Sequence, residues 1–410
     1  MNLGQRAGFL VTVCAFSPLP AQAALWAMDP SMEMACGAND NYGLAFDRGN
    51  RVASVSLNGG LVASRLTENA STSLTANLVG LGLRGDLHQN EWQDSFVLGQ
   101  TLTGPVDSLA FSARTTRDDT RQTPGGSADL LIGRGLQRNA DVTANWSHVL
   151  TERLTATTGL DVARTRYSSN LVGARDYQNG SASAALRYLV DERSSVTANV
   201  AHQDYRTLDD AVRSLSDSLS LGGTRALDET SNASLSLGAY RTRTTALQPV
   251  LVCAAERVAC ELGRVSPIVI VQAGHVARWG LQYSASYNGQ FTELTQFAAG
   301  AGRQQDPSGA GATVRSDTLK ASIDHAFSET VNGTLAWSRS TSTFLDGIGG
   351  TQSRLQSLGL LVSKALALRL TLRANVDYKR SSQSPARLDA NATSFAVTLR
   401  YEWQRLEAHR

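Results

Sequence analysis

Residues 393–403 read TSFAVTLRYEW, and the alternation in this stretch decides how the whole chain is interpreted. Its apolar side chains stand at every second position: Phe395, Val397, Leu399, Tyr401 and Trp403. The side chains between them are small or polar. Because successive side chains of a strand point to opposite faces, this stretch predicts a strand with one wholly apolar face. Two aromatic side chains close that face, as is typical of strands that meet lipid near the membrane surface.

The same two-residue period recurs along most of the chain. We expect about eighteen strands, with about sixteen as the alternative count. Their expected positions are 39–47, 50–66, 71–85, 91–102, 108–117, 139–150, 154–167, 177–189, 194–207, 215–226, 231–244, 267–276, 279–292, 314–327, 332–345, 351–363, 368–380 and 390–403. These segments are longer than the strands of soluble proteins, which average about five or six residues.

The connections between these strands alternate in length. Tight turns such as 151–153 and 190–193 alternate with long loops such as 118–138, 245–266 and 293–313. Short turns at one end and long loops at the other are typical of outer-membrane barrels, whose short turns face the periplasm. We therefore predict an all-β fold, a closed antiparallel up-and-down transmembrane barrel. The last strand would be its assembly-signal strand, and both chain ends would be periplasmic.

The first residues predict export. Arg6 precedes an apolar run from Ala7 to Phe16, and Ala21-Gln22-Ala23 fits a signal-peptidase site. We expect a cleavable signal peptide at 1–23, a periplasmic lead at 24–38, the barrel at 39–403 and a periplasmic tail at 404–410. The apolar run is too short to cross a bilayer as a helix. The expected location is the outer membrane of a Gram-negative cell.

Three cysteines follow the expected cleavage site. Cys253 and Cys260 flank the short stretch CAAERVAC, and an exported protein can keep a disulfide between them. Two free thiols are the alternative. Cys36 is left without a predicted role.

The sequence resembles a group of outer-membrane β-barrel porins found with exopolysaccharide and exosortase (PEP-CTERM) systems. The resemblance rests on the opening NDNYGLAF at 39–46 and on a repeated unit of strand, short turn and strand. Examples of the unit are LTERLTATTGLDVARTRY and LVDERSSVTANVAHQDY. The resemblance implies an outer-membrane channel or an export-accessory role and brings no catalytic residues. The seven residues after Trp403 depart from barrels that end on an aromatic side chain.

Enzymatic and cofactor chemistry is not indicated. The six histidines have no metal-ligand spacing, and the glycine-rich pieces do not precede helices as nucleotide-binding loops do. In Asn145-Trp146-Ser147-His148 the serine and the histidine would face opposite sides of a strand. The formal net charge of +2 suggests no nucleic acid partner. We expect no enzyme, no metal and no cofactor.

Strand parity assigns the charged side chains to two faces. The lumen side is expected to carry both signs of charge, from Asp161, Arg187, Lys320, Asp324, Arg369, Arg373, Asp377, Lys379, Arg400 and Glu402. A second set of arginines continues the apolar face beyond the membrane: Arg164, Arg166, Arg241, Arg243 and Arg339. Arginine binds phosphate through a fork of donors, so we expect these side chains to face lipopolysaccharide. The alternative is that the strand ends protrude above the membrane, where both faces are exposed to water.

These patterns favour a passive channel or an exopolysaccharide-export accessory pore. Its expected partners are outer-membrane lipid, lipopolysaccharide, the barrel-assembly machinery, and a polysaccharide or small polar solutes. The main alternative is a barrel without a transport role that interacts through the loops 118–138, 245–266 and 293–313. An outer-membrane enzyme is a more distant alternative.

Overall fold

The computed structural model describes residues 25–44, 46, 49–120, 135–168, 174–252, 268–309, 312–344, 352–384 and 388–409. Its regular elements are strands: β1 Leu25–Asn39, β2 Val52–Leu66, β3 Ala70–Gly85, β4 Gln89–Thr103, β5 Asp107–Asp119, β6 Leu136–Thr151, β7 Leu154–Tyr167, β8 Tyr177–Leu189, β9 Ser194–Thr207, β10 Val212–Ala226, β11 Asn232–Val252, β12 Ile268–Thr292, β13 Thr295–Ser308, β14 Ala312–Ser328, β15 Val331–Phe344, β16 Gln352–Ala367, β17 Leu370–Ser384, β18 Leu388–Glu402 and β19 Leu406–His409. The predicted signal peptide 1–23 lies outside the described residues. No helix long and apolar enough to cross a membrane occurs among the described residues.

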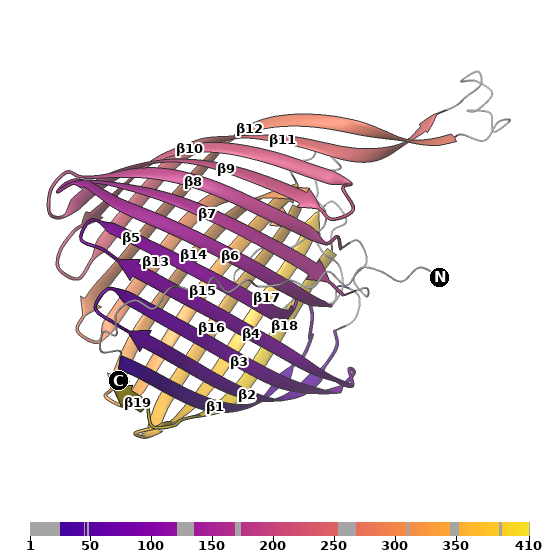
Figure 1. Cartoon of the computed structure of the whole chain (residues 1–410). Coiled ribbons are helices and arrows are strands. Elements are labelled where there is room, and N and C mark those ends of the chain that lie inside the picture. The colour runs from indigo at the N-terminus through magenta and orange to yellow at the C-terminus, as the bar shows by residue number, and fades with distance from the viewer. Residues whose placement is uncertain are drawn as a thin grey trace.

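The strands form one closed sheet, visible as a barrel in Figure 1. From β1 to β18 each strand pairs antiparallel with the next along the chain, and β1 also pairs with β18, which closes the ring. The short β19 continues the line of β18 and pairs with the first residues of β1. The predicted fold, a closed antiparallel barrel of 18 strands, is confirmed.

The first strand is not where the sequence predicted it. We expected a lead at 24–38 and a strand at 39–47, but the strand is Leu25–Asn39 and the chain leaves the sheet after it. Trp26, Met28, Met32 and Met34 alternate on its outer face. Pro30 stands at the outward position between Met28 and Met32, and a proline there made the segment look unlike a strand in the sequence. Within the expected tail, Leu406–His409 form β19, which pairs with β1 and so belongs to the sheet.

A second difference concerns β12 and β13. The expected strands at 267–276 and 279–292 are one continuous strand, Ile268–Thr292, and the expected loop 293–313 contains the strand Thr295–Ser308. The alternation of β12 runs unbroken through Ala277 and Arg278, where the sequence interpretation had placed a turn. β13 is rich in alanine and glycine, which have weak strand preference, so its pairing with β12 and β14 determines its conformation.

Three prolines that were expected in the lead or in loops lie inside strands. They are Pro30, Pro249 and Pro307. Proline has no backbone N–H and cannot donate a hydrogen bond to a ladder. Each of these three prolines lies where one neighbouring strand is not paired with it, so no donor is needed on that side. Pro249 lies beyond the end of the β10 ladder, Pro307 lies beyond the β12 ladder, and Pro30 faces the break between β18 and β19. These positions follow the rule for edge strands, although the loop assignments were wrong.

The short turns share a device that explains their repeated sequence. The first residue of each unit accepts a hydrogen bond from the backbone N–H two residues later. The Thr151 hydroxyl accepts one from the backbone N–H of Arg153 at 3.3 Å. In the β8–β9 turn, the Asp191 carboxylate accepts one from the backbone N–H of Arg193 at 2.8 Å. In the next turn Asp228 accepts bonds from Ser231 and Thr230. The hydroxyl of Ser231 holds the pKa of the Asp228 carboxyl below its usual value. Threonine, serine or aspartate is therefore required there to cap the turn.

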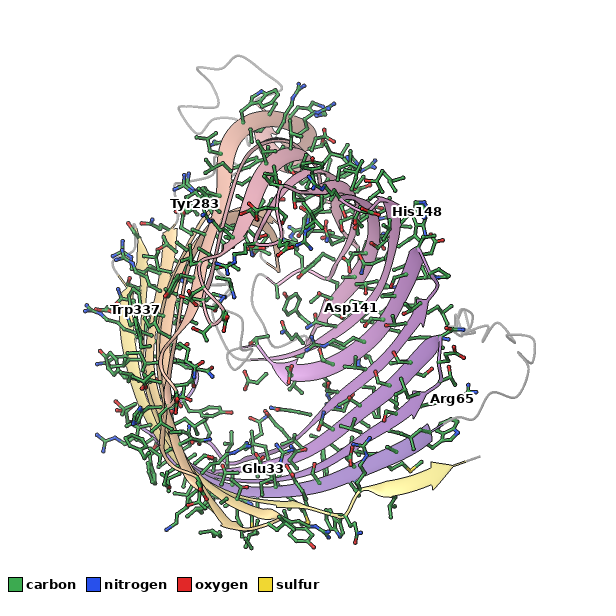
Figure 2. The ribbon with its side chains drawn as sticks, turned by 90° about the vertical axis from the view of Figure 1, so that its left-hand side faces the viewer. Glu33, Arg65, Asp141, His148, Tyr283 and Trp337 are labelled. Carbon is green, nitrogen blue, oxygen red and sulfur yellow. The ribbon has the colours of Figure 1, made fainter. Side chains whose placement is uncertain are left out.

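The two faces of the wall differ in polarity. Figure 2 shows Trp337, Tyr283, His148 and Arg65 on the outside of the barrel, and Glu33 and Asp141 on the inside. The outward residues include many exposed leucines and valines, such as Leu160 and Val162 at 61% exposure each. Aromatic side chains gather on the outer face near the turn end, including Trp26, Trp146, Tyr188, Phe327, Tyr401 and Trp403. This arrangement suits a wall surrounded by hydrocarbon, with aromatic side chains at its boundary.

One hairpin leaves the ring at the loop end. The strands β11 and β12 stay paired up to Val252 and Ile268 and project away from the barrel (Figure 1). The β12–β13 ladder ends at Tyr283 and Arg303, so the upper half of β12 pairs only with β11 among the described residues. The upper part of β13 and the start of β14 instead turn toward the interior.

The tight β10–β11 ladder generates a stability prediction. A Cβ atom added at Gly238 would lie 2.4 Å from the backbone oxygen of Leu219 and 2.9 Å from the Cα of Ser220. Backbone atoms cannot move aside without disturbing the ladder. We expect Gly238→Ala to destabilise the barrel by about 1–3 kcal/mol, measured by urea unfolding in lipid vesicles.

The matched control is Gly59→Ala in β2, where an added Cβ meets no atom within 4 Å. This variant should unfold at the same urea concentration as the parent protein, or at a higher one. Equal midpoints for the two variants would contradict the β10–β11 register.

Candidate functional site

The inner face of the barrel is polar. Strand register places Asp161, Arg187, Lys320, Asp324, Arg373, Asp377, Lys379, Arg400 and Glu402 on this face. Arg369 is an exception, because β17 begins at Leu370 and Arg369 lies in the preceding turn. Its backbone oxygen accepts a hydrogen bond from the N–H of Glu402 at 3.0 Å. The expected assignment of the Arg369 side chain to the lumen stays a prediction.

Negative charge gathers on one side of the lumen. Asp141 and Asp161 point inward from β6 and β7, beside Asp118 and Arg114 on β5. Neither Asp141 nor Asp161 makes an ion pair within the described part of the chain. Their strands lie halfway round the ring from β15 and β16.

The opposite side carries both signs of charge. Lys320, Arg373, Lys379 and Arg400 point inward from β14, β17 and β18, together with the acidic Asp324, Asp377 and Glu402. Arg400 pairs with Glu402 at 2.9 Å, and Arg373 lies 4.0 Å from Glu33 on β1. Glu33 was missed as a lumen residue because its segment was interpreted as a lead. The alternation around Met32 and Met34 is the signal that would have found it.

Water reaches the inner wall. Val62 and Leu361 face the lumen, yet their exposures are 40% and 37%. Side chains packed in a barrel core would be almost fully covered. Barrels of 16–18 strands are wide enough to enclose an aqueous channel. The turn-end half of the lumen is therefore an accessible passage with polar and charged walls.

A first segment narrows the lumen at the loop end. After β1 the chain turns inward, and Tyr42 packs against Val52 and Leu83 on the inner face of β2 and β3. Leu44 packs against the inner face of β18 and has a φ of 51°, which is unusual for leucine. The Asn41 side chain donates to the backbone oxygen of Asn391 at 2.8 Å. Residues 40–44 are thus an inward-folded connection, and no strand follows Asn39 among the described residues of the expected strand 39–47.

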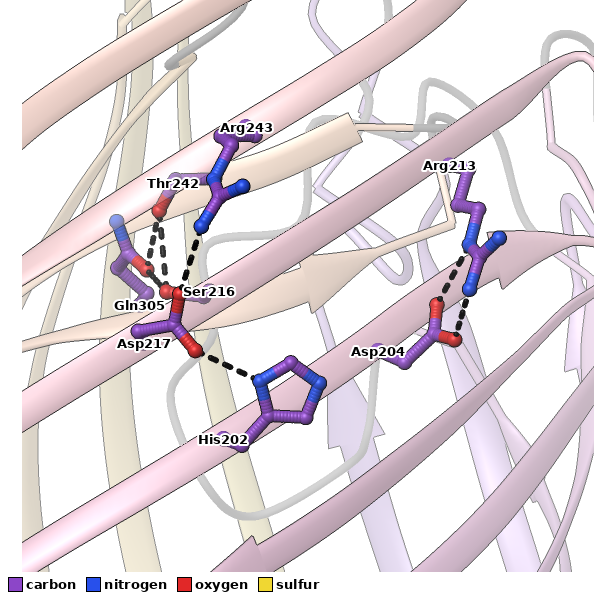
Figure 3. A network of polar contacts seen from close by, with 8 residues as sticks. All are labelled: His202, Asp204, Arg213, Ser216, Asp217, Thr242, Arg243 and Gln305. Carbon is purple, nitrogen blue, oxygen red and sulfur yellow. Dashed lines mark hydrogen bonds and ion pairs between the residues drawn. The ribbon is translucent and has the colours of Figure 1, made fainter.

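A second segment narrows the lumen from the opposite side. The oxygen of the Gln305 side chain accepts hydrogen bonds from Ser216 at 2.6 Å and Thr242 at 2.8 Å, on the inner face of β10 and β11 (Figure 3). The Tyr205 hydroxyl donates to the backbone oxygen of Ser308 at 3.0 Å. Ser308 and Tyr205 are almost fully buried. The tip of the β13–β14 hairpin therefore forms an inner layer against β9–β11.

The outer face holds its own polar cluster. His202 contacts Asp217 at 2.7 Å, Arg243 lies 3.4 Å from the same carboxylate, and Arg213 pairs with Asp204 (Figure 3). Register places Arg164, Arg166, Arg241, Arg243 and Arg339 on this face as well. Within the described residues, no group of three histidine, cysteine, aspartate or glutamate side chains could hold a metal ion.

One of the three cysteines after the expected cleavage site lies among the described residues. Cys36 is a free thiol that lies exposed on β1, and its alternation places it on the outer face. Cys253 and Cys260 lie outside the described residues, so their expected disulfide stays a prediction.

The expected assembly-signal residues Phe395, Val397, Leu399 and Tyr401 lie on the outer face of β18. Trp403 follows the strand, and its backbone N–H donates to the backbone oxygen of Pro30 at 3.1 Å.

Comparison with known proteins gives structural likeness without sequence likeness. No family model and no curated protein matches the sequence. Similar solved structures include OccAB3 of Acinetobacter baumannii, at 8% identity and a TM-score of 0.47 over 93% of this chain and 99% of that chain. The outer membrane protein OpdK of Pseudomonas aeruginosa has 11% identity and a TM-score of 0.47 over 93% and 99%. OccK2 (OpdF) of the same organism, solved in complex with glucuronate, has 11% identity and a TM-score of 0.46 over 93% and 97%.

Neighbouring residues of β7 allow a direct test of the two faces. In a variant whose cysteines are replaced by serine, Asp161→Cys should react with a water-soluble thiol reagent after insertion into vesicles, because residue 161 faces the lumen. Val162→Cys should be protected, because residue 162 faces outward among apolar side chains. Mass spectrometry measures the labelled fraction. Equal labelling of both variants would contradict the assignment of the faces.

Proposed function

We propose that this protein is a porin-like channel of a Gram-negative outer membrane that admits polar solutes by passive diffusion. The observation that carries the proposal is the contrast between the two faces of a closed barrel. The outer face is apolar with aromatic side chains near the turn end, and the inner face is polar and accessible to water. Only helices and closed barrels satisfy their backbone hydrogen bonds in lipid, which supports a membrane location for this barrel.

The charges of the lumen support a channel for polar solutes of mixed charge. Acidic side chains on β6 and β7 face a wall of mixed charge on β14, β17 and β18 across the passage. A solute with many hydroxyl groups and few charges would cross such a field without being held strongly by either wall. A role as an accessory pore for exopolysaccharide is the more specific form of this proposal. It rests on the same side chains and on the sequence resemblance.

A barrel without a transport role is the second candidate, and one observation favours it. The segment around Tyr42 and the tip of the β13–β14 hairpin both occupy the lumen at the loop end. If the two segments meet, the passage is closed there and the barrel acts as a structural or surface protein. The connection 293–313 can no longer supply a surface loop, because most of it is β13 and its inward tip.

Electrical recording separates the two candidates. The parent protein in a planar bilayer should show discrete current steps, since an aqueous lumen conducts ions. The double variant Tyr205→Phe, Gln305→Ala removes three hydrogen bonds that hold the hairpin tip against the wall. Its steps should be larger or noisier than those of the parent protein. A silent parent protein combined with a conducting variant would instead support the closed barrel.

The lysines provide a test of how the lumen selects ions. The chain has three, at 320, 364 and 379. Lys320 and Lys379 face the lumen, whereas Lys364 faces outward near the turn end. The variant Lys320→Gln, Lys379→Gln should shift the reversal potential in a salt gradient toward cations, because two positive charges leave the passage.

The control variant Lys364→Gln should leave the reversal potential unchanged. Identical shifts in both variants would show that the lumen charges do not govern the current.

A further inference from the structure

Five outward arginines lie together on β5, β6, β7 and β9. They are Arg117, Arg138, Arg164, Arg166 and Arg206, called the arginine patch below. Arg138 lies directly opposite Arg117 on one side and Arg166 on the other. In the adjacent row, Gln178 lies opposite both Arg164 and Arg206. Residues opposite each other in an antiparallel pair have Cβ atoms about 5 Å apart, so the patch concentrates positive charge.

The patch lacks the acidic partners that neutralise other outward arginines. Elsewhere on this face Arg213 pairs with Asp204, Arg303 with Asp317 and Arg380 with Asp389. Among the described residues no ion pair is formed by any member of the arginine patch. Asp94 stands opposite Arg117 at the end of the row without coming within ion-pair distance.

Like charges directly opposite each other destabilise a sheet. The row of three arginines therefore has an electrostatic cost that an external anion would remove. The register brings five arginines onto neighbouring strands here. Guanidinium forks match the oxygens of phosphate better than the lysine ammonium group does.

Apolar side chains begin at the next outward position toward the turn end. Val162 and Leu160 follow Arg164 on β7, and Val142 lies beside Val162 on β6. All three are exposed. A ligand that fits both regions has phosphate groups on a polar head and acyl chains that extend along the wall. A soluble anion would use the arginines alone.

We propose that the arginine patch binds the phosphorylated head group of an outer-leaflet glycolipid, lipopolysaccharide, whose acyl chains lie on the apolar strip formed by Val142, Leu160 and Val162. This assignment rests on the proposed membrane location. It is more specific than the initial hypothesis, which placed Arg164 and Arg166 with Arg241, Arg243 and Arg339. Arg243 shares the carboxylate of Asp217, and Arg241 lies over the ring of Trp279 at 5.2 Å.

The test compares full-length protein with the variant Arg138→Gln, Arg166→Gln. The parent protein in detergent should bind purified lipopolysaccharide and retain it through purification, measured as organic phosphate per barrel. The double variant should bind at least about tenfold more weakly, because two charge-assisted contacts are lost. Binding should also weaken with added salt. The matched control is Arg65→Gln, Arg225→Gln, which removes two outward arginines at the turn end and should bind like the parent protein.

Each other outcome has a defined meaning. Unchanged lipopolysaccharide retention by the double variant overturns the proposal, as does equal weakening in the control. Inorganic phosphate that displaces lipopolysaccharide completely at micromolar concentration would show a soluble-anion site and overturn the lipid assignment. If the double variant fails to fold, judged by heat-modifiable gel mobility, Arg138→Lys, Arg166→Lys replaces it and should show a smaller loss. The channel proposal is judged separately, because the double variant should conduct like the parent protein in phosphatidylcholine bilayers.

Discussion

The ladder between β1 and β18 is the interaction on which the rest of the barrel depends. It runs from Ser31 opposite Glu402 to Asn39 opposite Ser394. Without it both strands would expose a row of unpaired backbone groups, which hydrocarbon cannot satisfy. Pro30 stands where this ladder ends, and β19 resumes the pairing beyond it. A segment that looks like a polar lead in the sequence is therefore the strand that closes the ring.

Most of the wall could be predicted from the sequence, because the two-residue alternation is a local property. The strands at 154–167, 177–189 and 194–207 have the bounds that the pattern predicts. The failures have specific causes. A proline obscured the alternation of β1, and a turn was expected at Ala277 and Arg278, where β12 continues. β13 had too few large side chains to be recognised. The division of β12 and the omission of β13 offset each other, so the strand count was still right.

The candidate site shows a sharper limit of sequence reasoning. Parity assigns a strand residue to one face, and this was enough to place Asp161 or Lys320 in the lumen. Parity says nothing about segments that leave the sheet. Gln305 reaches Ser216 across 89 residues of sequence, and no local pattern encodes that contact. The opposition of Arg138 to Arg117 and Arg166 likewise depends on how three strands are aligned, which a single sequence does not display.

The free edge of β12 has a consequence for where the membrane must end. Above Tyr283, the backbone N–H and C=O groups on the β13 side of β12 have no partner strand among the described residues. Such groups are tolerated only where water can bond to them. The hydrocarbon layer can therefore rise no higher on this side than the last β12–β13 pair, Tyr283 and Arg303. The need to satisfy backbone hydrogen bonds thus sets the upper limit of the hydrocarbon layer on this side, and the projecting β11–β12 arm lies above that limit.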